Sequence, residues 1–162
     1  MPDIVSRYVG VCIFRHREGT EYLLLQRAAG ERVYPGVWQY VTGKMLPGEK
    51  ALDAARRELY EETSLTPLRW WVVPCCPSFF DPAADAIHLT PLFLAQVAPA
   101  AIPVLSPEHT SFRWETIGPA TRLLVWPGQR EGIRIAHDYI VCDVGTSLLS
   151  ACPPSRPGTE SS

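Results

Sequence analysis

GKMLPGEKALDAARRELYEETSL, residues 43–65, is the stretch that decides how this chain folds. Pro47 and Gly48 are typical of a loop, because proline fixes φ and glycine accepts a left-handed backbone. Residues 50–63 are rich in Ala, Leu, Arg and Glu, which are good helix formers, and contain neither glycine nor proline. The stretch therefore predicts a loop that leads into a helix.

Three carboxylates of this helix are predicted to share one face. Glu58 and Glu62 are one turn apart and Glu61 lies beside them, so the three like charges repel one another. A hard cation with oxygen ligands would neutralise them, and a divalent metal site is therefore one interpretation. The other interpretation is a solvated acidic helix face, which explains nothing upstream of the helix.

The spacing around these carboxylates carries more information than the carboxylates alone. After Gly43 come five residues and Glu49, then seven residues and the remainder of the pattern, Arg57-Glu58-Leu59, Glu61-Glu62 and Leu65. This arrangement resembles the signature of the Nudix (MutT-like) hydrolases, G-x5-E-x7-R-E-U-x-E-E-x-G-U, where U is bulky and aliphatic. Ser64 stands where that family has glycine. The resemblance implies the Nudix α/β/α sandwich with a mixed, curved sheet.

Composition and charge describe an ordinary globular domain. Hydrophobic residues make up 46% of the 162 residues, charged residues 20%, and the formal net charge is −2. That charge gives no general reason to expect nucleic-acid or membrane binding. The five cysteines show no metal-ligand spacing and predict reduced, packed thiols.

Targeting signals are not evident in the sequence. The first residues lack a basic region followed by an apolar run, so we expect no signal peptide. The long apolar run at residues 89–105 is interrupted by Pro91, Pro99 and Pro103, so we expect no membrane span. We therefore predict a cytoplasmic protein, either a monomer or a homodimer, that acts on a small nucleotide-like molecule.

Hydrophobic patterning along the chain predicts an α+β protein. The expected strands are at residues 4–14, 22–26, 38–42, 70–80, 86–97 and 111–116. Beside the central helix, a short helix is expected at 119–125 and a longer one after Pro127, whose apolar face carries Ile133, Ala136 and Ile140. We predict one domain over residues 1–145, followed by a disordered tail at 146–162 that is rich in Ser, Pro, Gly and Thr.

The resemblance to Nudix hydrolases implies roles for the residues of the signature. Glu58, Glu61 and Glu62 would be metal ligands, with the carbonyl of Gly43 as an additional ligand, and Mg²⁺ would be the cation, with Mn²⁺ able to substitute. Arg57 would orient a glutamate rather than contact the substrate. Glu49, outside the helix, would support the loop or bind the metal through water.

Glu108 is the second candidate, beside Glu58, for the general base that takes a proton from the attacking water. Residues 105–109, Leu-Ser-Pro-Glu-His, precede Phe112-Arg113-Trp114, and this run is similar to the dATP and dihydroneopterin triphosphate pyrophosphohydrolase branch of the family. In that branch the loop glutamate reaches the metal, which makes Glu108 a candidate ligand as well. The alternative is that Ser106, Pro107 and Glu108 merely begin a helical turn.

Four further residues are candidates for the substrate pocket, each with a structural alternative. Trp38 would stack on a base and Gln39 would hydrogen-bond it; the alternative for Trp38, which its residue type slightly favours, is core packing. Arg27 would contact phosphates, with surface solvation as the alternative. Phe80 would flank a base, and because adjacent residues of a strand point to opposite faces, Phe79 would then point away.

The expected activity is metal-dependent hydrolysis of a nucleoside or pterin triphosphate to the monophosphate and pyrophosphate, by water attack on phosphorus. One alternative is a Nudix domain that senses a nucleotide without turnover. Another is hydrolysis of a different diphosphate, at an RNA 5′ end, in a sugar nucleotide or in a dinucleoside polyphosphate. The sequence favours an enzyme over a sensor because every acidic position of the signature is intact.

Overall fold

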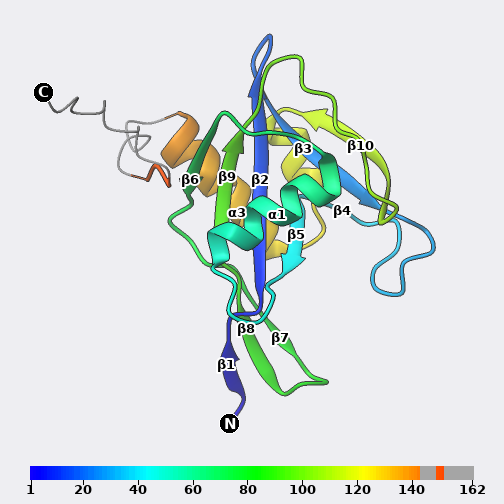
Figure 1. Ribbon diagram of the computed structural model, residues 1–162, viewed down its shortest axis with the longest axis vertical. Coiled ribbons are helices and arrows are strands. Elements are labelled where there is room, and N and C mark those ends of the chain that lie inside the picture. The colour runs from blue at the N-terminus through cyan, green and yellow to red at the C-terminus, as the bar shows by residue number, and fades with distance from the viewer. Residues whose placement is uncertain (143–148, 152–162) are drawn as a thin grey trace, which may run out of the picture.

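Strand β2 (Tyr8–His16) is the centre of the larger of two sheets in the computed structural model, which describes residues 1–142 and 149–151. Within these residues the strand order is β10-β3-β2-β9-β6, with β4 added beside β3 and β5 beside β2 (Figure 1). Strand β2 pairs in parallel with β9 and antiparallel with β3, so the predicted mixed sheet is confirmed. The remaining bounds are β3 (Thr20–Arg27), β4 (Trp38–Gln39), β5 (Val41–Lys44), β6 (Arg69–Val72), β9 (Leu92–Gln96) and β10 (His109–Glu115).

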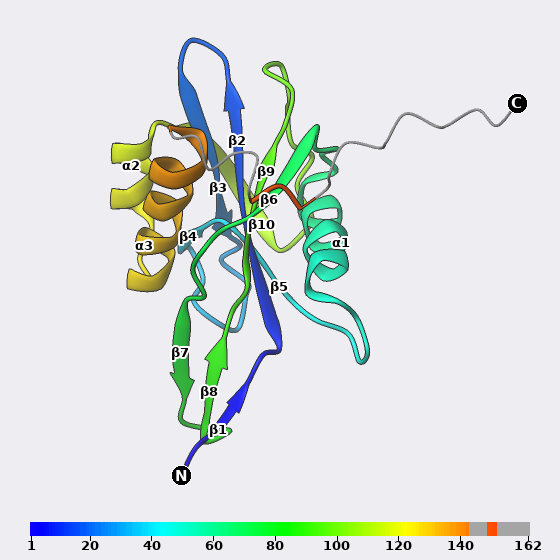
Figure 2. The same cartoon turned by 90° about the vertical axis from the view of Figure 1, so that its left-hand side faces the viewer.

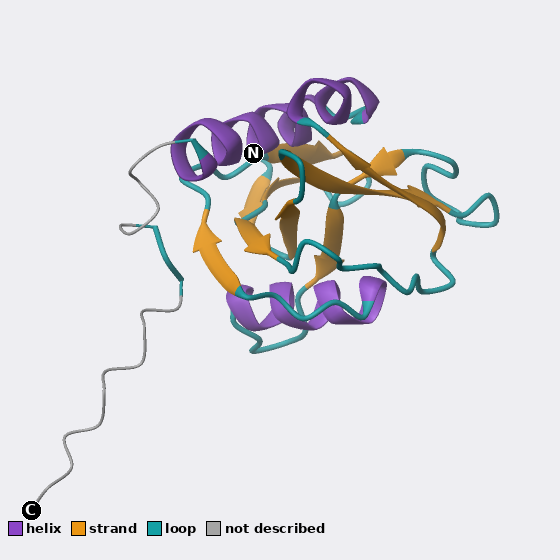
Figure 3. Ribbon diagram, turned by 90° about the horizontal axis from the view of Figure 1, so that it is seen from above, coloured by secondary structure: helices purple, strands orange, loops and turns teal. Residues whose placement is uncertain are grey.

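Both faces of this sheet are covered by helices. Alternate residues of β2 point to opposite sides, so Val9, Val11 and Ile13 join the core beneath α1 (Ala51–Thr63). Cys12 and Phe14 join the core beneath the helices of the other face. Figure 2 shows α1 on one side of the sheet with α2 and α3 on the other, and Figure 3 shows the same layers from above. The predicted α/β/α arrangement is therefore confirmed.

The C-terminal helical layer begins slightly earlier than predicted. Helix α2 spans Ile117–Leu123 and α3 spans Pro127–Ala136, with Pro127 in the first turn, where the missing N–H of proline has no cost. A short π-helix, η1 (His137–Val141), continues α3, and Ile133, Ala136 and Ile140 are buried as predicted. Among the described residues, none of the helices is long and apolar enough to cross a membrane.

Three of the predicted long strands are each divided in two, which corrects the sequence prediction. One part of each predicted strand belongs to a separate small sheet with the order β1-β8-β7, which extends from one end of the molecule (Figure 1). These parts are the beginnings of the strands predicted at 4–14 and 86–97 and the end of the strand predicted at 70–80. Exposed polar Ser6 and Arg7 separate β1 (Asp3–Val5) from β2, and prolines, which cannot donate to a ladder, divide the other two. Pro74 and Pro77 separate β6 from β7 (Ser78–Asp81), and Pro91 separates β8 (Ala86–Leu89) from β9.

Part of the predicted C-terminal tail lies beside the sheet. The N–H of Val72 donates to the carbonyl of Leu149 at 2.8 Å, and the N–H of Ala151 donates to the carbonyl of Trp70 at 2.9 Å. Residues 149–151 thus pair with the edge strand β6. The rest of the predicted tail lies outside the described residues.

The cysteines are only partly packed, which corrects a second prediction. Cys12 is buried in the core, and burial raises the pKa of its thiol well above the ordinary value. Cys75 is half-buried, whereas Cys76 and Cys142 are exposed. All four carry free thiols in the structure, and Cys152 lies outside the described residues.

Candidate active site

Gly43 lies where β5 brings the chain against the middle of α1. It pairs with Val9 of β2, and the next residues form the loop that leads into the helix. A Cβ atom at this position would lie 1.9 Å from Cδ of Glu58 and 2.1 Å from its Cγ, far inside contact distance. Any other residue here would displace the Glu58 side chain from its present position, so glycine allows this carboxylate to lie against β5.

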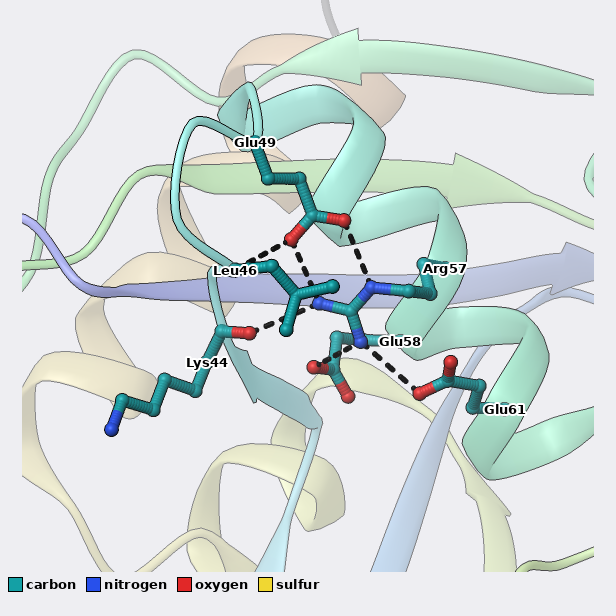
Figure 4. A network of polar contacts seen from close by, with 6 residues as sticks. All are labelled: Lys44, Leu46, Glu49, Arg57, Glu58 and Glu61. Carbon is teal, nitrogen blue, oxygen red and sulfur yellow. Dashed lines mark hydrogen bonds and ion pairs between the residues drawn. The ribbon is translucent and has the colours of Figure 1, made fainter.

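Arg57 and Glu49 fasten the loop to the helix through a two-bond ion pair. Arg57 Nε donates to Glu49 Oε1 at 2.8 Å, and Nη2 donates to Glu49 Oε2 at 2.9 Å (Figure 4). Arg57 Nη2 also donates to the Lys44 carbonyl at 3.0 Å, and the N–H of Leu46 donates to Glu49 Oε2 at 2.8 Å. These bonds lower the pKa of Glu49 to about 2. Glu49 therefore acts on the loop, one of the two roles expected for it.

The remaining guanidinium nitrogen of Arg57 holds two helix carboxylates. Nη1 donates to Glu58 Oε1 at 2.8 Å and to Glu61 Oε2 at 3.1 Å, as Figure 4 shows. The Glu61 side chain is 56% exposed, while that of Glu58 is 14% exposed. All the N–H groups of the Arg57 guanidinium thus donate to acceptors within the protein. This is consistent with the role that the family resemblance implies, in which the arginine orients glutamates rather than contacting the substrate.

Glu62 differs from its neighbours because its side chain is buried, at 5% exposure. Burial raises the pKa of this carboxyl well above the ordinary value, and the charges of Glu58 and Glu108 raise it further. Burial also raises the pKa of Glu58, an effect that the Arg57 guanidinium opposes and the charges of Glu61 and Glu108 reinforce. Glu58 and Glu62 are therefore each harder to ionise because of burial and of the neighbouring carboxylates.

A divalent cation fits the chemistry of this acidic group, Glu58, Glu61 and Glu62. Oε2 of Glu62 is buried and has no hydrogen-bond partner within the described residues, and carboxylate oxygens are the ligands that Mg²⁺ and Mn²⁺ prefer. In the present side-chain positions, no three His, Cys, Asp or Glu side chains of the described residues already stand together as a metal-binding group. Arg57 holds oxygens of Glu58 and Glu61, so rotation of these side chains is needed for them to converge with Glu62.

The loop before β10 adds Glu108 and a residue that the sequence did not single out. Glu108 is exposed, and its carbonyl accepts a hydrogen bond from the N–H of Ala28 at 2.8 Å. Its charge affects both Glu58 and Glu62, so the structure brings the loop glutamate to the helix carboxylates. The next residue, His109, is buried with Nε2 3.8 Å from Glu62 Oε2. Its position after Glu108 was the only sequence signal for it.

Arg27 is not a solvated surface residue, which corrects the alternative considered for it. Its side chain is 18% exposed, and it donates to the Val33 carbonyl at 2.9 Å and to Glu31 at 3.1 Å. Its positive charge opposes the rise in the pKa of Glu62. Burial, together with the charge of Arg27, lowers the pKa of His109 to about 4. Arg27 therefore ties the loop after β3 and lies near the acidic group.

The other three predicted pocket residues are dispersed. Trp38 is half-buried against the core beneath α2 and α3, and the Arg113 guanidinium lies 5.1 Å from its ring centroid. Gln39 is buried in β4. Phe80 is exposed in β7 of the small sheet, whereas Phe79 stacks on His88 from the other face, with ring centroids 4.8 Å apart.

A sandwich of helices around a mixed sheet, with an acidic helix suited to a divalent cation, defines the class to which this domain belongs. The NUDIX domain family model matches residues 6–134, most of the chain, and the chain belongs to this family. This result agrees with the resemblance carried by residues 43–65.

Two curated relatives match only part of their own length. An octanoyltransferase from Myxococcus xanthus is 31% identical over 137 residues, which are 80% of this chain and 36% of that protein. An RNA pyrophosphohydrolase from Bartonella bacilliformis is 42% identical over 60 residues, 35% of each chain. The chain thus spans about a third of the length of these relatives.

Two solved structures share the fold over most of this chain. An Ap4A hydrolase from C. elegans has 25% sequence identity and a TM-score of 0.70, covering 86% of this chain and 100% of that one. The dihydroneopterin triphosphate pyrophosphohydrolase of E. coli has 23% identity and a TM-score of 0.63, covering 86% and 99%. The second likeness concerns the fold alone.

Proposed function

We propose that this protein is a metal-dependent pyrophosphohydrolase that cleaves a phosphoanhydride bond by water attack on phosphorus. The observation that carries the proposal is the acidic group of α1, in which Glu62 is buried and Glu58 is half-buried next to like charges, while Arg57 orients Glu58 and Glu61. Such an arrangement is costly in a protein without a cation and useful with one. Membership of the Nudix family supports the same reading.

Under this proposal some residues of the site bind the cation, and one acts as the general base for the attacking water. Glu58, Glu61, Glu62 and the Gly43 carbonyl would hold Mg²⁺ or Mn²⁺, with Glu108 as a further ligand. When bound, the cation offsets the charge of the phosphates and of the transition state. Arg57 keeps the glutamates oriented, and Glu49 keeps the loop in place. Glu58 or Glu108 takes the proton of the attacking water, depending on which lies within hydrogen-bond reach of it.

The proposed substrate is a nucleoside or pterin triphosphate, cleaved to the monophosphate and pyrophosphate. The run Leu-Ser-Pro-Glu-His at residues 105–109 supports this branch. Trp38, Gln39, Arg27 and Phe80 remain candidates for substrate contacts, although Arg27 and Trp38 already have partners within the protein. The RNA pyrophosphohydrolase that is 42% identical over 60 residues makes an RNA 5′ end the second candidate.

A substrate screen tests the proposal. The purified protein is incubated with Mg²⁺ or Mn²⁺ and, separately, dATP, dihydroneopterin triphosphate, 5′-triphosphorylated RNA, a sugar nucleotide and a dinucleoside polyphosphate. For the triphosphates, phosphate and pyrophosphate are measured separately, because attack at the α-phosphorus releases pyrophosphate and attack at the terminal phosphorus releases phosphate. The sugar nucleotide and the dinucleoside polyphosphate release neither ion, so their nucleotide products are separated by chromatography. Glu62→Gln is the matched inactive control.

The products separate the alternatives. Pyrophosphate from dATP or dihydroneopterin triphosphate supports the proposed substrates. Cleavage of only the RNA, sugar nucleotide or dinucleoside polyphosphate keeps the enzyme and replaces the substrate. Nucleotide binding without cleavage of any compound, with either cation, would show a sensor and overturn the proposed hydrolysis.

A further inference from the structure

Next to the carboxylate of Glu62 lies a buried histidine that the proposed chemistry does not use. Nε2 of His109 is 3.8 Å from Oε2 of Glu62, and the His109 side chain is fully screened from solvent, at 0% exposure. Both ring nitrogens and Oε2 of Glu62 lack a hydrogen-bond partner within the part of the chain that the structure describes. Buried polar atoms are rarely left unpaired, so these three atoms next to one another call for an explanation.

The backbone fixes the position of this histidine relative to α1. The N–H of Val104 donates to the Thr63 carbonyl at 2.8 Å, and that of Ser106 donates to the Glu62 carbonyl at 3.2 Å. The N–H of His109 then donates to the Ser106 carbonyl at 3.1 Å. The segment before β10 is therefore attached to the last turn of α1, through the backbone carbonyls of Glu62 itself and of Thr63.

A β-bulge at the start of β10 directs the histidine inward. His109 pairs with Arg27, whereas Ser111 pairs with the adjacent Gln26, so Thr110 is the extra residue. Bulges re-aim side chains and are frequent beside active sites. Here the bulge separates a buried His109 from the half-exposed remainder of the strand, and it places the ring against Glu62.

We propose that His109 is a positioning residue, whose Nε2–H donates to Oε2 of Glu62 and thereby leaves the other oxygen of that carboxylate for the cation. A shortening of the 3.8 Å separation to about 2.9 Å forms the bond. Metal-ligating carboxylates are commonly held by hydrogen bonds of this kind. The inference rests on the proposed function, because it takes Glu62 to be a metal ligand.

His88 provides a matched control elsewhere in the same chain. It is also buried, its Nε2 also lies 3.8 Å from a carboxylate oxygen, Oδ2 of Asp81, and both of its ring nitrogens also lack partners among the described residues. It belongs to β8 in the small sheet, apart from the acidic helix. Removing either imidazole therefore perturbs a similar buried environment, and only one of the two supports Glu62.

Mn²⁺ alone is the probe, and its binding to the full chain is followed by the EPR signal of the free ion. His109→Phe keeps a buried ring without the donor and should weaken Mn²⁺ binding about 10- to 100-fold. His109→Gln restores an N–H donor and should stay within about threefold of the wild type, as should His88→Phe. Equal Mn²⁺ affinity of the wild type and a folded His109→Phe variant would overturn the inference.

Imidazole ¹⁵N NMR of the wild-type protein tests the same bond without any substitution. On addition of Mg²⁺, the Nε2 resonance of His109 should shift, and that of His88 should not. An unmoved His109 resonance, with Mg²⁺ bound, contradicts the role even where His109→Phe fails to fold.

The two proposals fail in different ways. Weaker Mn²⁺ binding by His109→Phe, in a protein that hydrolyses none of the compounds, supports the positioning role and rejects the hydrolase. Hydrolysis by a wild-type protein whose Mn²⁺ affinity is insensitive to His109→Phe does the reverse. A wild type that binds no Mn²⁺ rejects both.

Discussion

Glu62 has the least favourable environment of the three helix carboxylates. Its side chain is buried, at 5% exposure, and lies close to the charges of Glu58 and Glu108, and its Oε2 has no hydrogen-bond partner among the described residues. An ionised carboxylate in such a place destabilises the folded protein unless a cation is bound. Under the proposed function, the unfavourable environment of Glu62 lowers the stability of the metal-free protein and raises its affinity for the cation, so substitutions of this residue should separate the two properties.

Glu62→Gln is the most direct test of this separation. The amide keeps the shape and removes the charge, so the metal-free variant should be as stable as the wild type or more stable, by up to about 2 kcal/mol. Turnover should fall by at least about 100-fold, because a metal ligand charge is lost. Urea unfolding in EDTA and steady-state assays at saturating Mg²⁺ measure the two effects. Wild-type turnover in the variant would remove Glu62 from the metal site.

Ser64 supports a second prediction, about the residue where the chain departs from the family signature. It follows the last residue of α1 and has φ of 54°, in the left-handed region that glycine accepts more easily than serine. Ser64→Gly should therefore be neutral or stabilise the protein by up to about 1 kcal/mol. Ser64→Ala, which keeps the Cβ atom, should not gain this stability. Chemical denaturation of the three proteins decides, and a clear loss in the glycine variant would contradict the prediction.

At the scale of an element, the loop between β5 and α1 depends on one arginine. Arg57→Lys keeps the charge but loses the planar two-bond contact with Glu49, so the loop should open more often. The exchange rate of the Leu46 amide, which donates to Glu49 Oε2, should rise about tenfold in hydrogen-exchange NMR. Arg56→Lys is the control, since Arg56 is exposed and its ion pair with Asp53 spans 3.7 Å. Unchanged exchange at Leu46 would show that other contacts hold the loop.

The same ion pair predicts the behaviour of the protein in acid. The pKa of Glu49 falls from 4.5 to about 2 on folding, so the unfolded chain binds the proton more readily. The stability that Glu49 contributes is therefore complete above about pH 4.5 and is lost as the pH falls towards 2. Glu49→Gln should flatten the dependence of unfolding free energy on pH in that window, measured by urea titrations at successive pH values. A slope equal to that of the wild type would contradict the shift.

The sequence predicted the elements near the signature better than those far from it. The helix at residues 51–63 has a local cause in its composition, and its end at Ser64 followed from the family position of a glycine. The division of residues 86–97 at Pro91 had a local cue in the proline, whereas the pairing of β8 with β1 did not. Strand pairing depends on residues distant in sequence, and patterning within a segment does not contain it.

The same distinction applies to the candidate site. Gly43, Glu49 and Arg57 were identified by spacing. In the structure Arg57 bonds Glu49, and Gly43 lies against the Glu58 side chain, all within one loop and one helix and the strand before them. The burial of Glu62 and the role of His109 depend on a segment more than forty residues away in the sequence and on a bulge within it. No pattern around residue 62 predicts which glutamate that segment will cover.

For the molecule as a whole, the acidic group joins parts that are distant in sequence. Gly43 comes from β5, the carboxylates from α1, Glu108 from the segment before β10, His109 from the start of β10, and Arg27 from the end of β3. These elements belong to one face of the sandwich and to the sheet beneath it (Figure 2). A cation held among them would therefore require the folded arrangement of the entire domain, and its binding should stabilise the domain as a unit.

The last prediction is that adding or removing metal changes the stability of the whole domain. Mn²⁺ at about 100 times its dissociation constant should stabilise the wild type by about 2.7 kcal/mol relative to the same protein in EDTA. For a domain of this size that gain corresponds to a rise in melting temperature of about 5–10 °C, observable by calorimetry. Glu62→Gln should start at an equal or higher melting temperature in EDTA and gain much less from Mn²⁺. Two proteins with the same gain would place the cation elsewhere, because a site that includes Glu62 cannot respond equally with and without its charge.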